Sequence, residues 1–177
     1  MVSAIAYYVM AWETAVTTAL RESGVRTVAY LPDSVIAPLI ELTERDEYFS
    51  SYRVAREEEG VALLGGAWLG GECGVLVCQS SGLATCFNAL GSHSIANGLP
   101  FVGLVTRRGD LGEHNLVQVA GGYNMPRLLD DIGVRNRSLD AGDPIGPTVE
   151  RAVDTARSTG QPYVLLLERN LTGGKDD

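Results

Sequence analysis

Short apolar runs alternate along the chain with longer segments of helical periodicity, and this alternation most restricts the possible folds. The strand-like runs are Val25–Leu31, Gly74–Cys78, Phe101–Thr106 and Tyr163–Leu167, and helix-like segments separate them. Strands that alternate with helices form a mainly parallel sheet covered on both faces. The sequence therefore predicts an α/β fold, a three-layer αβα sandwich with a mainly parallel central sheet.

Further elements are expected between these runs. Strands are predicted over 52–55 and 134–139, and helices over 5–23 (with Gly24 directly after the last turn), 33–44, 57–69, 83–97, 125–132 and 144–158. A long polar loop is predicted over 107–122, and long loops in compact domains are often functional. The chain of 177 residues suits a single domain over residues 1–170, followed by a polar tail over 171–177.

Charge and apolar content restrict the function. The formal net charge of −8 argues against nucleic acid or an anionic membrane as the main partner, because either would repel the average surface. The apolar N-terminus has no Lys or Arg before Arg21, so an amphipathic helix is a better interpretation than a signal peptide. No apolar run reaches the roughly 18 residues that a membrane span needs. The three cysteines form no CxxC pair, which disfavours disulfides and zinc and suggests a reducing, cytoplasmic setting.

Four polar segments are expected at one edge of the sheet. Three of them, Leu31–Ser34, Gln79–Gly82 and Arg107–Asn115, directly follow predicted strands, and the glutamate triplet Glu57–Glu59 follows the short strand over 52–55. In open parallel sheets, ligands bind at the carboxyl ends of the strands. These segments are therefore the candidates for a functional site.

Several common sites are absent from the sequence. Ser80 and Ser81 lack the G-x-S-x-G pattern of a nucleophile elbow, and only His93 and His114 could act as their base. No phosphate-binding P-loop and no dinucleotide-binding G-x-G-x-x-G follows a strand, and no metal-ligand spacing occurs. His93 lies midway along a predicted helix, so it is interpreted as a packed or interfacial residue.

Three motifs together resemble one family. Val28–Ser34 (VAYLPDS) is similar to a V-P-D-S loop, Arg56–Trp68 to a glutamate helix E-x-x-A…A-G-Y, and Cys78–Leu90 to Q-N-S-G-L-G-N…N-P-L. Over roughly residues 5–168 the chain resembles the pyrimidine-binding (PYR) domain of thiamine-diphosphate-dependent decarboxylases, particularly phosphonopyruvate and sulfopyruvate decarboxylases. The resemblance implies the decarboxylation of a small acidic 2-oxo acid.

The resemblance also implies a partner. Such enzymes bind the diphosphate and Mg²⁺ through a second domain that carries G-D-G and a spaced Asn, and Gly109-Asp110 and Gly142-Asp143 do not complete this motif. The chain would then be the α-type subunit of a split enzyme. A β-type subunit would bind the diphosphate and Mg²⁺ in a hetero-oligomer of two plus two chains. Two alternatives remain open, namely a thiamine-diphosphate carboligase or oxidoreductase subunit, and a non-catalytic scaffold of the same fold.

The resemblance assigns roles to individual residues. The family's glutamate, which bonds the cofactor's aminopyrimidine ring, precedes an aromatic residue by ten positions, and counting back from Trp68 selects Glu58, so that Glu57 and Glu59 face solvent or another subunit. His114 is the candidate proton shuttle. Asp33 and Ser34 are interpreted either as substrate ligands or as plain helix caps, and Arg107 and Arg108 as ligands of an acidic substrate group. The remaining candidate cofactor ligands are Pro32, Gln79, Ser80 and Gly82, and no metal ligand is expected in this chain.

Overall fold

The computed structural model describes residues 11–173, and the strands form one six-stranded sheet in the order β2-β1-β3-β4-β6-β5. All five neighbouring pairs of strands are parallel. The strands are β1 (Thr27–Tyr30), β2 (Ser50–Arg53), β3 (Val75–Gln79), β4 (Val102–Thr106), β5 (Arg135–Leu139) and β6 (Tyr163–Leu167). The predicted α/β fold is confirmed, and the sheet is wholly parallel.

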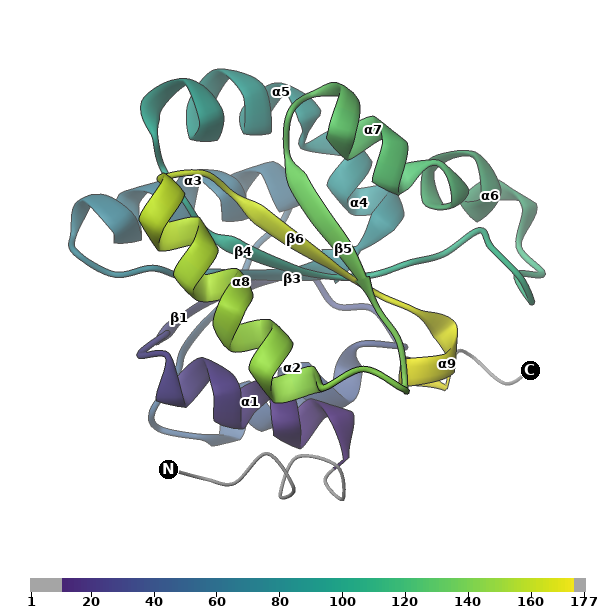
Figure 1. Ribbon diagram of the computed structural model, residues 1–177, viewed down its shortest axis with the longest axis horizontal. Helices are drawn as coiled ribbons and strands as arrows, with labels where there is room; N and C mark the ends of the chain where they lie inside the picture. Colours follow the sequence, from purple (N-terminus) through teal and green to yellow (C-terminus); the bar gives the residue numbers. More distant parts are fainter. Residues whose placement is uncertain (1–10, 174–177) are drawn as a thin grey trace.

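Helices cover both faces of the sheet (Figure 1). One face packs against α1 (Trp12–Glu22), α2 (Ala37–Arg45) and α8 (Ile145–Thr159). The other face packs against α3 (Glu57–Leu69), α4 (Ser80–Thr85), α5 (Phe87–Ala89), the π-helical turn η2 (Leu90–Ile95) and α7 (Met125–Asp131). Two short helices, α6 (Leu116–Tyr123) and α9 (Arg169–Thr172), follow the β4 loop and β6.

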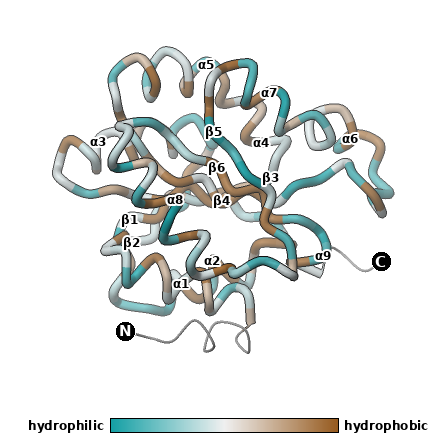
Figure 2. Tube along the Cα trace, in the orientation of Figure 1, coloured by the Kyte–Doolittle hydropathy of each residue, from teal (hydrophilic) through white to brown (hydrophobic). Residues whose placement is uncertain are grey.

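The central strands are buried on both faces. Successive residues of β3 alternate between the two cores, with Val75 and Val77 in one and Leu76 and Cys78 in the other. Figure 2 shows the resulting apolar stretches along the middle of the sheet. Continuous apolar runs of this kind are typical of strands whose two faces are both covered by helices, which explains why these strands were predictable.

Three local predictions are wrong. Helix α2 begins at Ala37, so Asp33 and Ser34 lie in a turn ahead of it and do not cap it. The expected turn over Gln79–Gly82 is absent, because α4 begins immediately after β3. The expected loop over 107–122 ends in helix α6, whose apolar residues face outward and so lack the usual amphipathic pattern.

The chain ends are only partly described. The start of the predicted N-terminal helix lies in residues 1–10, outside the described part, as do most of the segment 1–12 considered as a signal peptide and most of the predicted tail, in residues 174–177. From Trp12 onward the first helix is present, and Gly24 follows it with the positive φ of 69° expected after a helix end. Across residues 11–173, none of the helices has both the length and the apolar character to cross a membrane.

Candidate functional site

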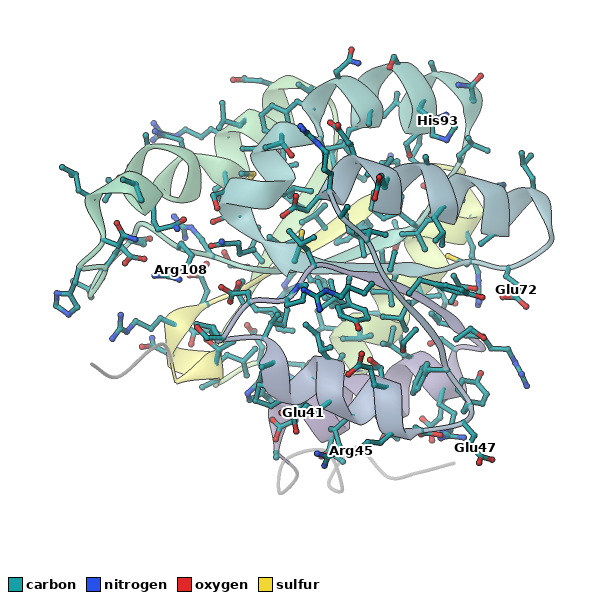
Figure 3. All side chains as sticks on the ribbon, turned by 180° about the vertical axis from the view of Figure 1, so that it is seen from behind. Glu41, Arg45, Glu47, Glu72, His93 and Arg108 are labelled. Atoms are coloured by element: carbon teal, nitrogen blue, oxygen red, sulfur yellow. The ribbon has the colours of Figure 1, made fainter. Side chains whose placement is uncertain are left out.

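The parallel sheet places the carboxyl ends of its strands at one edge of the molecule. Figure 3 shows Arg108, which follows β4, at one end, and Glu72, which precedes β3, at the other. At the carboxyl edge, the segments after β1, β3, β4, β5 and β6 surround a pocket of about 940 Å³. Six of the residues singled out in the sequence line this pocket, namely Asp33, Ser34, Gln79, Arg107, Arg108 and His114.

The three glutamates that open α3 have three different surroundings. Glu59 accepts hydrogen bonds from the backbone N–H groups of Ala55 (2.8 Å) and Arg56 (3.4 Å), so it caps the helix. Glu58 is 42% exposed and pairs with the Arg56 guanidinium at 2.8 Å. Glu57 is only 7% exposed. The interpretation that Glu57 faces solvent is therefore wrong, and Glu58 lacks the dry surroundings that its predicted role needs.

Glu57 lies directly against Gly82 of α4. A Cβ at position 82 would overlap the Glu57 carboxyl group, so the glycine leaves room for this side chain in the position that it occupies. The Glu57 carboxylate makes no hydrogen bond or ion pair with any other residue of the described chain. Burial raises the pKa of the neighbouring Cys86 thiol to about 12, with a smaller contribution from the Glu57 charge. The structure thus places a buried, unpartnered carboxylate at the carboxyl edge.

The residues at the end of β3 divide into two kinds. Gln79 lines the pocket, and its Oε1 is buried without a hydrogen-bond partner among the described residues. Ser80 is fully buried and outside the pocket lining, and its Oγ accepts a hydrogen bond from the backbone N–H of Arg108 at 3.1 Å. Ser80 therefore fixes the loop after β4 and has no surface to offer a ligand. Pro32 is exposed and does not line the pocket.

Arg107 and Arg108 line the pocket but are already paired within the chain. The Arg107 guanidinium contacts Glu168 at 3.0 Å and Asp110 at 2.9 Å. Arg108 forms a two-pronged pair with Glu113, at 2.7 and 3.1 Å. This hydrogen bonding to Arg108 lowers the pKa of Glu113 to about 2. Both arginines thus hold the loop in place through their ion pairs, although the Nε of Arg107 is buried without a partner among the described residues.

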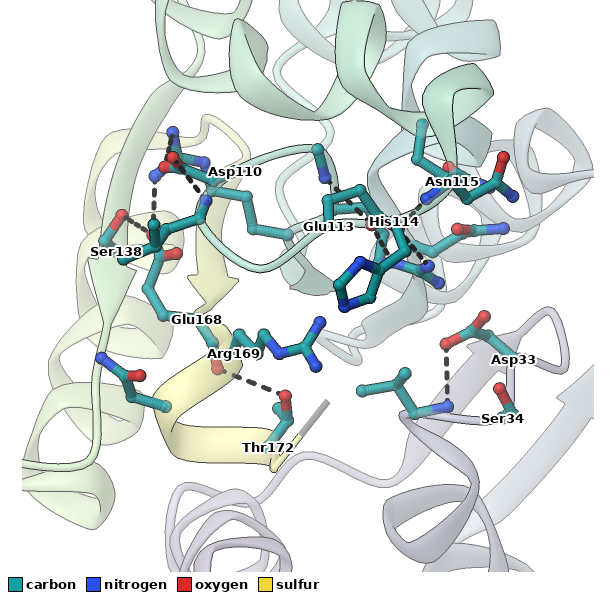
Figure 4. Close-up of a pocket in the computed structure, with 18 of the residues that line it drawn as sticks. Asp33, Ser34, Asp110, Glu113, His114, Asn115, Ser138, Glu168, Arg169 and Thr172 are labelled. Carbon is teal, nitrogen blue, oxygen red and sulfur yellow. Dashed lines mark hydrogen bonds and ion pairs between the residues drawn. The ribbon is translucent and has the colours of Figure 1, made fainter. Parts of the chain in front are cut away.

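The other predicted ligands lie on opposite walls of the pocket. His114 is exposed on the β4 loop, and its ring lies over the cavity in Figure 4. Asp33 accepts a hydrogen bond from the backbone N–H of Val35 at 3.1 Å, which fixes the turn after β1. Ser34, which follows it, is exposed. The structure therefore brings His114, Asp33 and Ser34 to one cavity.

Sequence reasoning missed Arg169, which lines the pocket from α9. Arg169 lies just before the predicted polar tail over 171–177 and was given no role, although it follows a strand end just as Arg107 does. His93 is remote from the pocket (Figure 3). It packs against Gly65 of α3, and its Nε2 is buried without a partner among the described residues. Within residues 11–173 no three His, Cys, Asp or Glu side chains are grouped so that they could hold a metal ion.

Comparisons with known proteins give a consistent relationship. No protein-family model matches the chain. The sulfopyruvate decarboxylase α subunit of Methanococcus maripaludis is 29% identical over 154 residues, which cover 87% of this chain and 92% of that subunit. The sulfopyruvate decarboxylase of Methanosarcina acetivorans is 28% identical over 90% of this chain, which spans only 41% of that protein. The phosphonopyruvate decarboxylase of Streptomyces viridochromogenes is 40% identical over 62% of this chain and 27% of its own length.

A solved structure supports the fold. It is 2-oxoglutarate:ferredoxin oxidoreductase from Magnetococcus marinus, with 2-oxoglutarate, coenzyme A and succinyl-CoA bound. It matches 92% of this chain and 29% of that chain with a TM-score of 0.70, at 17% identity. The fold and the sequence relationships agree with the motifs on the carboxyl edge, and the chain is similar over most of its length to sulfopyruvate decarboxylase α subunits and over 62% of its length to part of phosphonopyruvate decarboxylase.

Proposed function

We propose that the chain is the α-type subunit of a two-chain, thiamine-diphosphate-dependent decarboxylase that acts on a small acidic 2-oxo acid. The relationship to sulfopyruvate decarboxylase α subunits over nearly the full length of both chains supports this activity. The observation that carries the proposal is the buried Glu57 carboxylate, which lies on Gly82 without a partner in the described chain.

The residues of this chain fit the pyrimidine half of thiamine diphosphate. A buried carboxylate without a partner is costly unless a ligand satisfies it, and the Oε1 of Gln79 is a buried acceptor that also lacks a partner among the described residues. Glu57 and Gln79 would hold the pyrimidine ring, and Gly82 allows close approach. In the described chain there is no cluster of ligands for Mg²⁺. The diphosphate and the metal ion would therefore be held by the partner chain.

Glu57 replaces Glu58 as the proposed catalytic glutamate. When bound, thiamine diphosphate supplies a carbon nucleophile and takes up the electrons released with CO₂. Glu57 would hold a proton at its carboxyl oxygen and share it with a ring nitrogen, which requires a site that excludes water. Only Glu57 of the three glutamates has this burial.

The pocket that Gln79 lines, and which Glu57 and Gly82 do not line, would hold the substrate. His114, which lies over the cavity on the β4 loop, is the candidate proton donor to the carbon that loses CO₂. The turn at Asp33 and Ser34 forms the wall opposite the loop. The loop itself is anchored by the Arg107 and Arg108 ion pairs, and it would shield the reacting atoms from water.

The surface beside the pocket would bind the partner chain. Five large apolar side chains of the segment 111–123 are between 37% and 93% exposed, namely Leu111, Leu116, Val117, Val119 and Tyr123. This α6 surface is visible as brown segments on and before α6 in Figure 2. Leu111 also lines the pocket, so the surface is continuous with the site that needs a second chain. The Methanosarcina relative, of which this chain spans 41%, carries further sequence in the same polypeptide.

Reconstitution tests the proposed function. The chain is co-expressed with a second polypeptide that carries the G-D-G…Asn motif, and CO₂ release is measured with thiamine diphosphate, Mg²⁺ and either sulfopyruvate, phosphonopyruvate or pyruvate. We expect turnover of an acidic 2-oxo acid by the two-chain complex and none by the chain alone. Turnover by the isolated chain, or failure of the complex to release CO₂ from any of the three acids, would contradict the proposal.

A further inference from the structure

Three arginines line the pocket, and two of them are neutralised by carboxylates of the same chain. Glu168, the partner of Arg107, and Glu113, the partner of Arg108, are themselves largely buried. Moving either arginine onto a substrate would leave a buried carboxylate without its partner, which is strongly unfavourable. These two guanidinium groups are therefore unsuited to binding a substrate anion.

Arg169 is the exception. No carboxylate of the described chain lies within ion-pair distance of its guanidinium, whose Nη1 donates a hydrogen bond to the carbonyl oxygen of Gly112. Figure 4 shows the guanidinium reaching into the cavity between His114 and the turn at Asp33 and Ser34. A guanidinium carries five N–H donors in a planar fork, so donors remain for a ligand.

The pocket positions this guanidinium from two sides. Arg169 opens α9, which is anchored by the buried Leu171 and by hydrogen bonds from the backbone N–H groups of Leu171 and Thr172 to the carbonyl of Glu168. On the other side Gly112 has a φ of +84°, and a Cβ there would lie 3.3–3.5 Å from Arg169 side-chain atoms. Gly112 thus lets the β4 loop close onto Arg169. The pocket's other carboxylates also have partners within the chain: Asp33 and Asp140 accept hydrogen bonds from nearby backbone N–H groups, and Asp110 pairs with Arg107.

We propose that Arg169 binds the second anionic group of the substrate, a tetrahedral sulfonate or phosphonate attached to the 2-oxo acid, and thereby sets specificity against neutral 2-oxo acids such as pyruvate. This inference rests on the proposed function. A planar pair of N–H donors matches two oxygens of such a group. Arg169 is the cation of the described pocket that can do so without breaking an internal ion pair.

Steady-state kinetics of the two-chain complex test this assignment. We compare Arg169→Gln and Arg169→Lys with Arg135→Gln, a control at an exposed arginine on the opposite edge of the sheet. Loss of a charge-assisted hydrogen bond predicts that Arg169→Gln lowers kcat/KM for sulfopyruvate by about 10- to 150-fold, mainly through KM. Turnover of pyruvate should be unchanged, Arg169→Lys should retain part of the affinity, and the control should match the wild type.

Binding of sulfoacetate provides a readout that does not require turnover. Sulfoacetate has the carboxylate and the sulfonate but no 2-oxo group, and its affinity for the complex is measured by calorimetry. Weaker binding to Arg169→Gln than to Arg135→Gln supports the inference. Equal binding, or an equal loss of sulfopyruvate and pyruvate turnover in Arg169→Gln, overturns it. A wild-type complex that releases no CO₂ instead contradicts the proposed function, and sulfoacetate binding still tests Arg169.

Discussion

At the scale of single residues, the first turn of α3 shows how burial separates chemically identical side chains. Glu57, Glu58 and Glu59 are consecutive, and each step along a helix rotates the side chain by roughly 100°. Glu57 therefore points between α3 and α4, Glu58 lies beside Arg56, and Glu59 reaches back to the helix start. Of the three glutamates, only Glu57 has a carboxylate that is both buried and available to bind a ligand.

Replacement of these glutamates tests the assignment. We expect Glu57→Gln in the two-chain complex to lower kcat by roughly 10²–10⁴-fold, because the amide cannot share the proton while the shape is preserved. Glu58→Gln is the matched control and should retain most of the activity, since it loses only an exposed ion pair. The measurements are CO₂ release and the rate of deuterium exchange at C2 of the bound cofactor. A normal exchange rate in Glu57→Gln with a slow one in Glu58→Gln would restore Glu58 as the catalytic residue.

At the scale of elements, the segment from Arg107 to Asn115 is held by charge pairs rather than by apolar packing. Arg108 and Glu113 form two hydrogen bonds, and the Glu113 carboxylate also accepts one from the backbone N–H of Gly109 at 3.2 Å. Gly122 of α6 packs directly against the backbone of Arg108. These contacts couple the loop to α6, so one wall of the pocket and the α6 surface form one unit.

The Glu113 pair predicts a pH dependence of stability. The carboxyl pKa falls from 4.5 to about 2 in the folded chain, so the ionised group stabilises the fold above pH 4.5, and this contribution is lost as the pH falls towards 2. We expect Glu113→Gln to lower the free energy of unfolding by roughly 1–3 kcal/mol at pH 7. The difference from the wild type should shrink steadily below pH 4.5.

Urea unfolding between pH 7 and pH 3 provides the measurement. Glu41→Gln, which removes an exposed i,i+4 ion pair with Arg45, is the control and should cost less than about 1 kcal/mol at every pH. A difference between Glu113→Gln and the wild type that stays constant down to pH 3 would show that the pair is not responsible.

At the scale of the whole molecule, the apolar residues are distributed unevenly. The two cores are buried on either side of the sheet, whereas the α6 surface leaves apolar side chains exposed next to the pocket. Exposed apolar patches beside a site commonly mark interfaces. The proposed partner chain would cover this surface and close the site at the same time.

Substitutions on α6 test this interface. We expect Leu116→Ser combined with Val117→Ser to weaken association with the partner by about 100-fold or more, because each of the two side chains contributes roughly 1.5–3 kcal/mol when it is fully buried. Leu69→Ser is the control, since Leu69 is 78% exposed at the far end of α3. Sedimentation velocity on mixtures of the two chains gives the affinities. Unchanged affinity of the α6 variant, or equal weakening by Leu69→Ser, would exclude this surface as the interface.

Much of the fold could be predicted from the chain itself because its signals are local. The apolar runs mark the strands that are covered on both faces, and the acidic first turn and the glycine after Leu69 mark the ends of α3. Helix α6 was missed because its apolar residues face outward, and helix prediction relies on an apolar face that is turned inward. Similarly, the order of β5 and β6 in the sheet depends on contacts between distant residues.

The sequence by itself determined that the candidate site segments lie at the carboxyl edge of a parallel sheet, because strand direction follows from the alternation of strands and helices. A spacing of three, four and seven residues places Glu57 on the same face of α3 as Gly60, Val61 and Leu64, which are buried. The sequence therefore contained a sign that Glu57 is buried, but the prediction relied instead on counting ten positions back from Trp68. Only the tertiary structure decided which arginines are paired. Arg107 and Glu168 are 61 positions apart. Whether an arginine forms an ion pair therefore depends on residues that are distant in the sequence and that folding brings together.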